Sequence, residues 1–131
     1  MILDTNFLGA LDSDDPAAVE LGQQLESNNL RLRVPTPVVF EIFYAIEGSD
    51  DPTELQTRYE ALFANLPRTD LPERVAKRAG RLYRRHEDSN QKKNLDLVDA
   101  MIAATALDLN EPVVTNDQAF QDVAGLSVRT Y

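Results

Sequence analysis

Two aspartates follow short apolar runs that are typical of strands buried within a sheet. Asp4 comes directly after Ile2-Leu3, and Asp117 lies just beyond the run Val113-Val114-Thr115. In an open α/β sheet, ligands bind beyond the carboxyl ends of the strands. Both carboxylates are therefore expected at the edge of the sheet where a site for chemistry would lie.

Two further carboxylates lie within apolar segments that are expected to form helices. Glu41 is the only charged residue between Val38 and Ile46, and a helix that is apolar all round should be buried. A carboxylate in such a helix must be paired, lie near a metal ion or stand at the mouth of a cleft. Asp99 lies in the first turn of the Ala-rich helix that we predict over residues 96–107.

Four carboxylates that converge in this way would suit a hard divalent cation. Two carboxylates about 4 Å apart repel by roughly 4 kcal/mol at the effective dielectric near a protein surface, so the cluster needs a cation or bound protons. Mg²⁺ and Mn²⁺ prefer such oxygen ligands. The sequence has no cysteine, and its single histidine, His86, stands among charged residues on a segment that we expect to be solvated. Zinc and a histidine-based triad are therefore disfavoured.

Each aspartate also has a purely structural interpretation, which the sequence leaves open. Asp4 and Asp117 could simply cap the helices that follow them. Asp96 and Asp99 stand three residues apart in a first helical turn, where negative charge complements the helix dipole. We interpret Asp96 as a helix cap rather than a metal ligand.

The segments that must position these side chains alternate between short apolar runs and amphipathic stretches. This alternation predicts an α/β fold, with one domain over residues 1–131 and three layers, α/β/α, around a central parallel sheet of about five short strands. Thr36 is expected to cap the third helix, with Pro37 in its first position. The predicted strands span residues 1–3, 30–34, 67–71, 112–115 and 126–129. The predicted helices span residues 7–11, 16–28, 38–47, 53–66 and 96–107, with a basic helix opened by Pro72.

Charge is unevenly distributed along the chain. The formal net charge is −9, yet residues 73–93 hold eight basic residues against three acidic ones. This segment is either a surface that contacts nucleic acid, because phosphate charge dominates such binding, or a solvated helix whose arginines pair with acids. The candidate contacts, which would bind RNA if the substrate is RNA, are Arg78, Arg81, Arg84 and Arg85.

Composition also bears on the environment of the protein. Abundant acids and scarce lysines suggest a halophilic protein kept soluble at high salt, where charge repulsion is screened. No apolar run approaches the ~20 residues of a membrane span, so no membrane association is expected. No signal peptide opens the chain, and we expect a cytoplasmic protein.

The acidic residues and their surroundings together resemble a PIN-domain ribonuclease, most closely a VapC-type toxin of a toxin–antitoxin pair. The order and spacing of the motifs and the total length all agree with that family. The residues that carry the resemblance are Ile2-Leu3-Asp4-Thr5-Asn6, Glu41 after Pro35-Thr36-Pro37, the run from Asp99 to Leu107, and the run from Val113 to Phe120.

The resemblance implies an Mg²⁺-dependent (or Mn²⁺-dependent) endoribonuclease whose partners are RNA, a cognate antitoxin and a second copy of the chain. Asp4, Glu41, Asp99 and Asp117 would form the catalytic and metal-binding site, with Asp4 and Asp99 as direct ligands. Hydrogen bonds that orient these carboxylates would come from Thr5, Asn6, Thr115 and Asn116.

Other functions remain open at this point. The same fold could serve a nuclease that processes ribosomal RNA or acts in RNA quality control. A catalytically inactive module that binds RNA or protein is a further alternative. A signalling receiver domain is disfavoured, because no lysine follows residue 93 and the third predicted strand lacks an acceptor aspartate.

Overall fold

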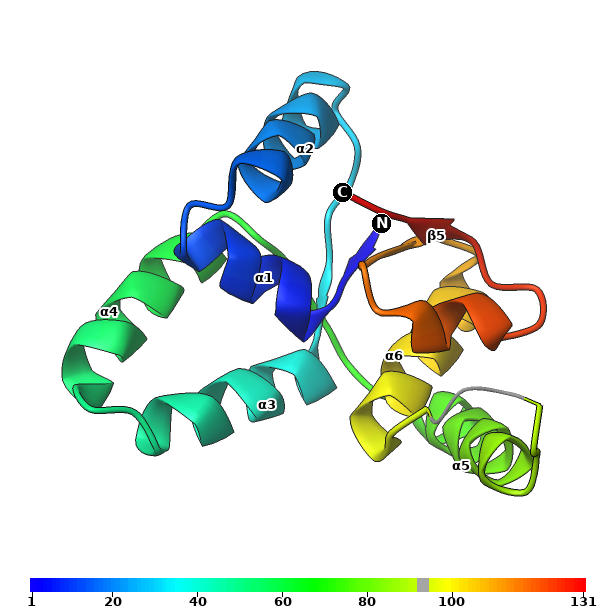
Figure 1. Ribbon diagram of the computed structural model, residues 1–131. Helices are drawn as coiled ribbons and strands as arrows, with labels where there is room; N and C mark the ends of the chain where they lie inside the picture. Colours follow the sequence, from blue (N-terminus) through cyan, green and yellow to red (C-terminus); the bar gives the residue numbers. More distant parts are fainter. Residues whose placement is uncertain (92–94) are drawn as a thin grey trace.

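The computed structural model describes residues 1–91 and 95–131, and the basic residues Lys92 and Lys93 lie outside the described part. Figure 1 shows β1 near the centre of the molecule, with α1, α3 and α4 on one side and α5 and α6 on the other. The strands are β1 (Ile2–Leu3), β2 (Val34–Pro35), β3 (Arg68–Thr69), β4 (Val113–Val114) and β5 (Val128–Arg129). The helices are α1 (Thr5–Asp12), α2 (Pro16–Ser27), α3 (Thr36–Glu47), α4 (Pro52–Phe63), α5 (Glu73–Glu87), α6 (Leu97–Leu109) and the 3₁₀ helix η1 (Gln118–Asp122).

The strands are all parallel, as predicted, but they do not form one regular five-stranded sheet. They form a three-stranded sheet of order β1-β4-β5 and a two-stranded sheet of order β2-β3. A parallel bridge between Ile2 and Arg33 joins the two sheets. The second predicted strand, residues 30–34, is reduced to Val34–Pro35, since only these two residues pair with β3. Leu30, at the predicted start, is exposed.

Aspartates in the acidic loops cap the helices that follow them. Asp15 accepts a hydrogen bond from the Ala18 N–H at the start of α2, and Asp51 does the same for Glu54 at the start of α4. The expected cap at Thr36 is wrong: α3 begins at Thr36 itself, and the cap position is held by Pro35 without a side-chain hydrogen bond. The extended backbone of Pro35 already belongs to β2, so the chain turns into the helix one residue earlier than predicted.

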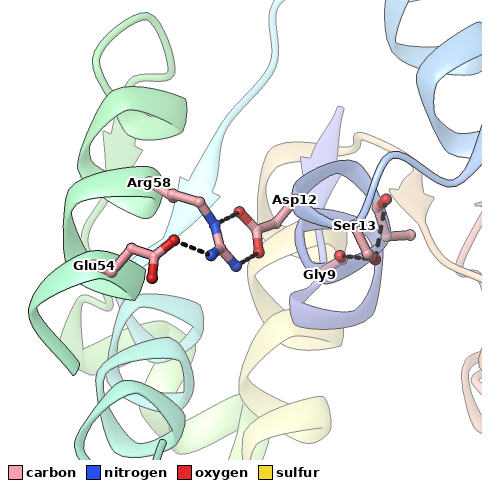
Figure 2. A network of polar contacts seen from close by, with 6 residues as sticks. Gly9, Asp12, Ser13, Glu54 and Arg58 are labelled. Carbon is pink, nitrogen blue, oxygen red and sulfur yellow. Dashed lines mark hydrogen bonds and ion pairs between the residues drawn. The ribbon is translucent and has the colours of Figure 1, made fainter. Parts of the chain in front are cut away.

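An ion pair joins α4 to α1, the helix that follows Asp4. The Arg58 guanidinium donates to both carboxylate oxygens of Asp12, at 3.1 Å and 2.8 Å, and lies 3.5 Å from Glu54 (Figure 2). In the same view, the Ser13 hydroxyl donates to the Gly9 carbonyl at the end of α1. Two guanidinium nitrogens of Arg58 bind the two carboxylate oxygens of Asp12. Because this contact is bidentate, it favours one orientation of α1 and α4 as well as one distance between them.

Burial differs from the expectation in two places. His86 is fully buried rather than solvated, because it continues the spacing of Val75, Ala79 and Leu82 along the face of α5 that packs on α6. In α3, Val38, Ile42 and Ile46 are buried, but Phe40 is 66% exposed and Tyr44 is 79% exposed. An apolar helix is therefore covered here on only part of its circumference.

Within the described residues, no helix combines the length and apolar character that crossing a membrane would require.

Candidate active site

Asp4 stands directly after β1 and is only 3% exposed. One of its carboxylate oxygens accepts a hydrogen bond from the Phe7 N–H at 2.8 Å, so Asp4 does cap α1. The other oxygen accepts a hydrogen bond from the Thr115 hydroxyl. Each carboxylate oxygen has two acceptor positions, so capping the helix does not prevent Asp4 from binding a further group.

The parallel pairing of β1 and β4 places Asp4 beside Thr115. Leu3 pairs with Val114 in the register of the sheet. Asp4 and Thr115 are the next residues along the chain, so both stand just beyond the carboxyl ends of the two strands. The Thr115 hydroxyl also accepts a hydrogen bond from the Asp117 N–H at 3.0 Å. One buried hydroxyl therefore connects the two aspartates that follow neighbouring strands.

Asp117 also has a capping role. Its side chain accepts a hydrogen bond from the Ala119 N–H at 2.9 Å, at the start of η1. It is partly exposed, whereas Thr115 is fully buried. The structural interpretation of Asp117 is thus correct, and it is compatible with a position in the site.

Glu41 lies in the second turn of α3 and is partly buried. The Thr5 hydroxyl, in the first turn of α1, donates a hydrogen bond of 2.5 Å to Glu41. This contact supplies the partner that a carboxylate in an apolar helix requires. It also ties α3 to the residue that immediately follows Asp4.

Asp99 comes from the first turn of α6, and the N-cap of that helix is Asp96. The Asp96 side chain accepts a hydrogen bond from the Asp99 N–H at 2.7 Å, as the capping interpretation predicted. Asp96 is exposed, whereas Asp99 is partly buried. The two carboxyl groups of this turn therefore differ in environment although they are only three residues apart.

Asp4 and Asp99 share two acidic neighbours. The pKa of Asp4 is raised to about 6, chiefly by burial and in part by the charges of Asp117 and Glu41, although the hydrogen bonds from Thr115 and Phe7 act to lower it. The pKa of Asp99 is raised to about 7, chiefly by burial and in part by the charges of Asp96, Asp117 and Glu41. Because Asp117 and Glu41 act on both groups, the predicted residues Asp4, Glu41, Asp99 and Asp117 form one acidic cluster, with Asp96 at its margin.

The predicted orienting residues divide into two groups. Thr5 and Thr115 contact carboxylates of the cluster, as described. Asn6 is exposed, and the Asn116 amide instead pairs with the backbone of Tyr131, donating at 2.8 Å and accepting at 2.8 Å. In this structure, therefore, the two threonines and not the two asparagines hold the acids in place.

Tyr131 is a neighbour of the site that the sequence analysis missed. Its ring makes an edge contact with Phe7, with centroids 5.1 Å apart. Burial raises its pKa, and the nearby carboxylates of Asp4 and Asp15 contribute to the rise. No local signal could have revealed this proximity, because it depends on β5 returning the chain to the edge of the sheet beside β4.

The residues of the cluster fit a hard cation by their chemistry. All of the clustered donors are oxygens. Two of the acids have pKa values raised by burial and, to a smaller extent, by like-charged neighbours, whose repulsion a cation would relieve. Among residues 1–91 and 95–131, no three acids or histidines are close enough together to enclose a metal ion. Mg²⁺ usually binds proteins through one or two carboxylates and keeps several waters, so a pair of acids suffices.

Comparison with known proteins agrees with this fold. No curated protein matches the chain in sequence. The crystal structure of VapBC2 from Rickettsia felis, bound to a DNA fragment from its promoter, contains a chain that is 20% identical, with 99% of this chain and 97% of that chain covered and a TM-score of 0.85. DNA-bound VapBC from Salmonella typhimurium gives 22% identity, coverage of 98% and 96%, and a TM-score of 0.84.

A third structure is that of a VapC toxin. VapC20 from Mycobacterium tuberculosis, a toxin that cleaves the sarcin-ricin loop, is 15% identical, with 95% of each chain covered and a TM-score of 0.70. At these identities the likeness establishes a shared fold. The PIN domain family model matches residues 1–126 of the sequence. The predicted resemblance is therefore confirmed, and this chain belongs to the PIN domain family.

Proposed function

We propose that the protein is an Mg²⁺-dependent endoribonuclease and the toxin of a toxin–antitoxin pair. The observation that carries this proposal is the acidic cluster: Asp4, Glu41, Asp99 and Asp117 come from four separate elements and influence one another at the carboxyl ends of β1 and β4. Converging carboxylates destabilise a folded protein unless they bind a cation or protons. A member of the PIN domain family with this cluster intact is well suited to hydrolyse phosphodiesters.

We assign each acid a catalytic role from its contacts. Asp4 and Asp99 would hold Mg²⁺ or Mn²⁺, which when bound supplies Lewis acidity and neutralises phosphate charge. The Thr115 hydroxyl holds the Asp4 carboxylate in one orientation, and the Thr5 hydroxyl does the same for Glu41. Glu41 or Asp117 would then orient the attacking water and accept its proton.

RNA is the proposed substrate. The support is the shared fold with a toxin that cleaves the sarcin-ricin loop, together with the basic surface of α5, where Arg78, Arg81 and Arg85 are exposed. Arg84, the fourth candidate contact, is paired with Glu87 and Asp88 and is left out of this proposal. A surface of this kind in a chain of net charge −9 favours a polyanionic ligand.

An antitoxin and a second copy of the chain are the proposed partners. Similar chains occur in toxin–antitoxin complexes from Klebsiella pneumoniae and Haemophilus influenzae. The exposed rings of Phe40 and Tyr44 border a hollow of about 750 Å³ on α3, which offers apolar area for such contacts. Phe63, on the neighbouring helix α4, is buried in the core and offers no such area.

The test compares two aspartates of the same helical turn. Asp99→Asn should abolish cleavage of RNA, because it removes a proposed metal ligand. Asp96→Asn should keep activity, because asparagine caps a helix as well as aspartate does and Asp96 is exposed. Cleavage by the wild type should require Mg²⁺ or Mn²⁺ and stop with chelator. Retained metal-dependent cleavage by Asp99→Asn would refute the assignment.

The toxin role needs a separate test in cells. Induced expression of the wild type should arrest growth, and Asp99→Asn should not. Co-expression of the adjacent gene should restore growth if that gene encodes the antitoxin. Cleavage of ribosomal RNA precursors without growth arrest would instead support a processing nuclease.

A further inference from the structure

One face of α5 carries a row of four arginines. Arg74, Arg78, Arg81 and Arg85 recur at the spacing of successive helical turns, and all four are exposed. At about 100° per residue, they lie about 100° around the helix from the buried line of Val75, Ala79, Leu82 and His86, because each arginine directly precedes a residue of that line. We call these four residues the arginine row.

The arginine row borders a groove of about 480 Å³. The remaining lining comes from Leu82 on α5, Leu107 and Asp108 near the end of α6, and Ala124 beyond η1. Asp108 is the only acid among the lining residues, so four positive charges face one negative charge. The groove is therefore strongly basic although the whole chain has a net charge of −9.

Most of this positive charge is not neutralised within the protein. Arg74 pairs with Asp108, at 3.0 Å and 2.8 Å. Within the described part of the chain, Arg78, Arg81 and Arg85 form no ion pair, whereas Arg84 pairs with Glu87 and Asp88. Arg84 also points away from α6, about 90° from the arginine row. The row is thus distinct from the wider set of basic residues on this helix.

The row lies beside the end of α6 that is remote from the acidic cluster. Leu107 and Asp108, the α6 residues that line the groove, stand eight and nine residues beyond Asp99, and Arg74 contacts Asp108. Nine residues of helix correspond to roughly 14 Å. Eleven residues of helix separate Arg74 from Arg85, which corresponds to roughly 16 Å. A strand cut at the acidic cluster could continue along this groove.

We propose that the groove along the arginine row binds the phosphate backbone of single-stranded RNA several nucleotides from the cleaved bond. This inference rests on the proposed function, because it takes RNA as the substrate. The exposed guanidiniums match phosphate geometry, and such contacts add affinity without reading the bases. The substrate must therefore extend beyond the cleavage point, and short RNAs lose this contribution.

The first experiment measures binding without cleavage. A labelled 20-nucleotide RNA is titrated in chelator with wild type, Arg78→Gln/Arg81→Gln and the control Arg84→Gln, followed by fluorescence anisotropy at several salt concentrations. The double variant should bind about 10- to 30-fold more weakly at 0.1 M salt, and its slope of log K against log salt should fall by about 1.4, because each phosphate contact on a single strand contributes about 0.7. Arg84→Gln should match the wild type, and unchanged melting curves should show that all variants are folded.

Two binding results would overturn the inference. The first is equal RNA affinity and salt slope for the wild type and the double variant, or an equal loss in Arg84→Gln. The second is unchanged RNA binding while the double variant loses affinity for a polyglutamate probe, which would assign the groove to an acidic protein segment.

Cleavage assays separate this inference from the proposed function. With a long RNA the double variant should show a raised KM and an unchanged kcat, whereas with a four-nucleotide RNA it should match the wild type. Equal loss on both RNAs would overturn the groove assignment but leave the nuclease standing. Absence of cleavage by the wild type, with binding that still depends on the arginine row, would refute the nuclease and support the groove.

Discussion

At the scale of single residues, the acids of the cluster oppose folding in the metal-free protein. The pKa of Asp99 is raised to about 7 and that of Asp4 to about 6, from an ordinary value of 3.8. The folded state therefore binds more protons than the unfolded chain between about pH 4 and pH 7. Stability must fall as the pH rises through this window, because ionisation is easier in the unfolded chain.

Replacing Asp99 by asparagine should remove this penalty. In chelator at pH 8, we expect Asp99→Asn to melt several degrees above the wild type, and the difference should vanish below about pH 3, where Asp99 is protonated in both states. Thermal unfolding followed by circular dichroism across this pH range measures the effect. Added Mg²⁺ should stabilise the wild type more than the variant. A variant that melts below the wild type at pH 8 would contradict the coupling.

Thr115 should set the pH dependence of catalysis through Asp4. Its hydroxyl lowers the pKa of Asp4 by donating to the carboxylate. Thr115→Val should therefore shift the acidic limb of the pH–rate profile for RNA cleavage to higher pH. It should also lose roughly 1–3 kcal/mol of stability, because the Asp117 N–H loses its acceptor. Thr115→Ser keeps the hydroxyl and should restore the profile; if it does not, the methyl group matters rather than the hydrogen bond.

At the scale of elements, α3 combines two surfaces. Val38, Ile42 and Ile46 pack into the core, whereas Phe40 and Tyr44 project outward. Large rings that remain exposed on one helix face are typical of a protein interface. This face is the part of the molecule best suited to the proposed second copy of the chain.

Polar substitution on this face should change the oligomeric state. We expect Phe40→Ser/Tyr44→Ser to turn a dimer into a monomer, with little effect on melting, because both side chains are already exposed. Light scattering after size-exclusion chromatography gives the mass directly. Leu30→Ser is the matched control, since Leu30 is an exposed apolar residue outside α3. If both variants remain dimeric, the dimer forms through another surface.

The sequence predicted most of the features that depend on neighbouring residues, with the cap at Thr36 as an exception. Asp4, Asp96 and Asp117 were recognised both as residues able to cap helices and as members or neighbours of an acidic site, because strand ends and helix starts are local features. The pairing of Asn116 with Tyr131 joins residues from separate elements and has no local signal. His86 is different: its spacing from Val75, Ala79 and Leu82 indicated burial, but its charged neighbours suggested exposure. The packing of α5 against α6 decided the outcome.

At the scale of the whole molecule, the net charge of −9 should make stability depend on salt. Screening relieves the repulsion among acids, so the melting temperature should rise between 0.1 M and 2 M KCl. Arg58→Gln gives a comparison, because it removes the ion pair with Asp12, a contact that salt weakens. The variant should melt below the wild type at 0.1 M KCl, and this difference in melting temperature should shrink at 2 M KCl. A melting temperature that is flat or falls with KCl would remove the halophilic interpretation.

The double use of Asp4 has a consequence for how this site can change over evolutionary time. The oxygen that caps α1 is present in asparagine as well as in aspartate. A single change, Asp4→Asn, could therefore silence the enzyme while the chain still folds and still presents its surfaces to its partners. Selection for a stable protein would not remove such a variant. One substitution would thus be enough to produce an inactive protein that competes with the active form for the same partners.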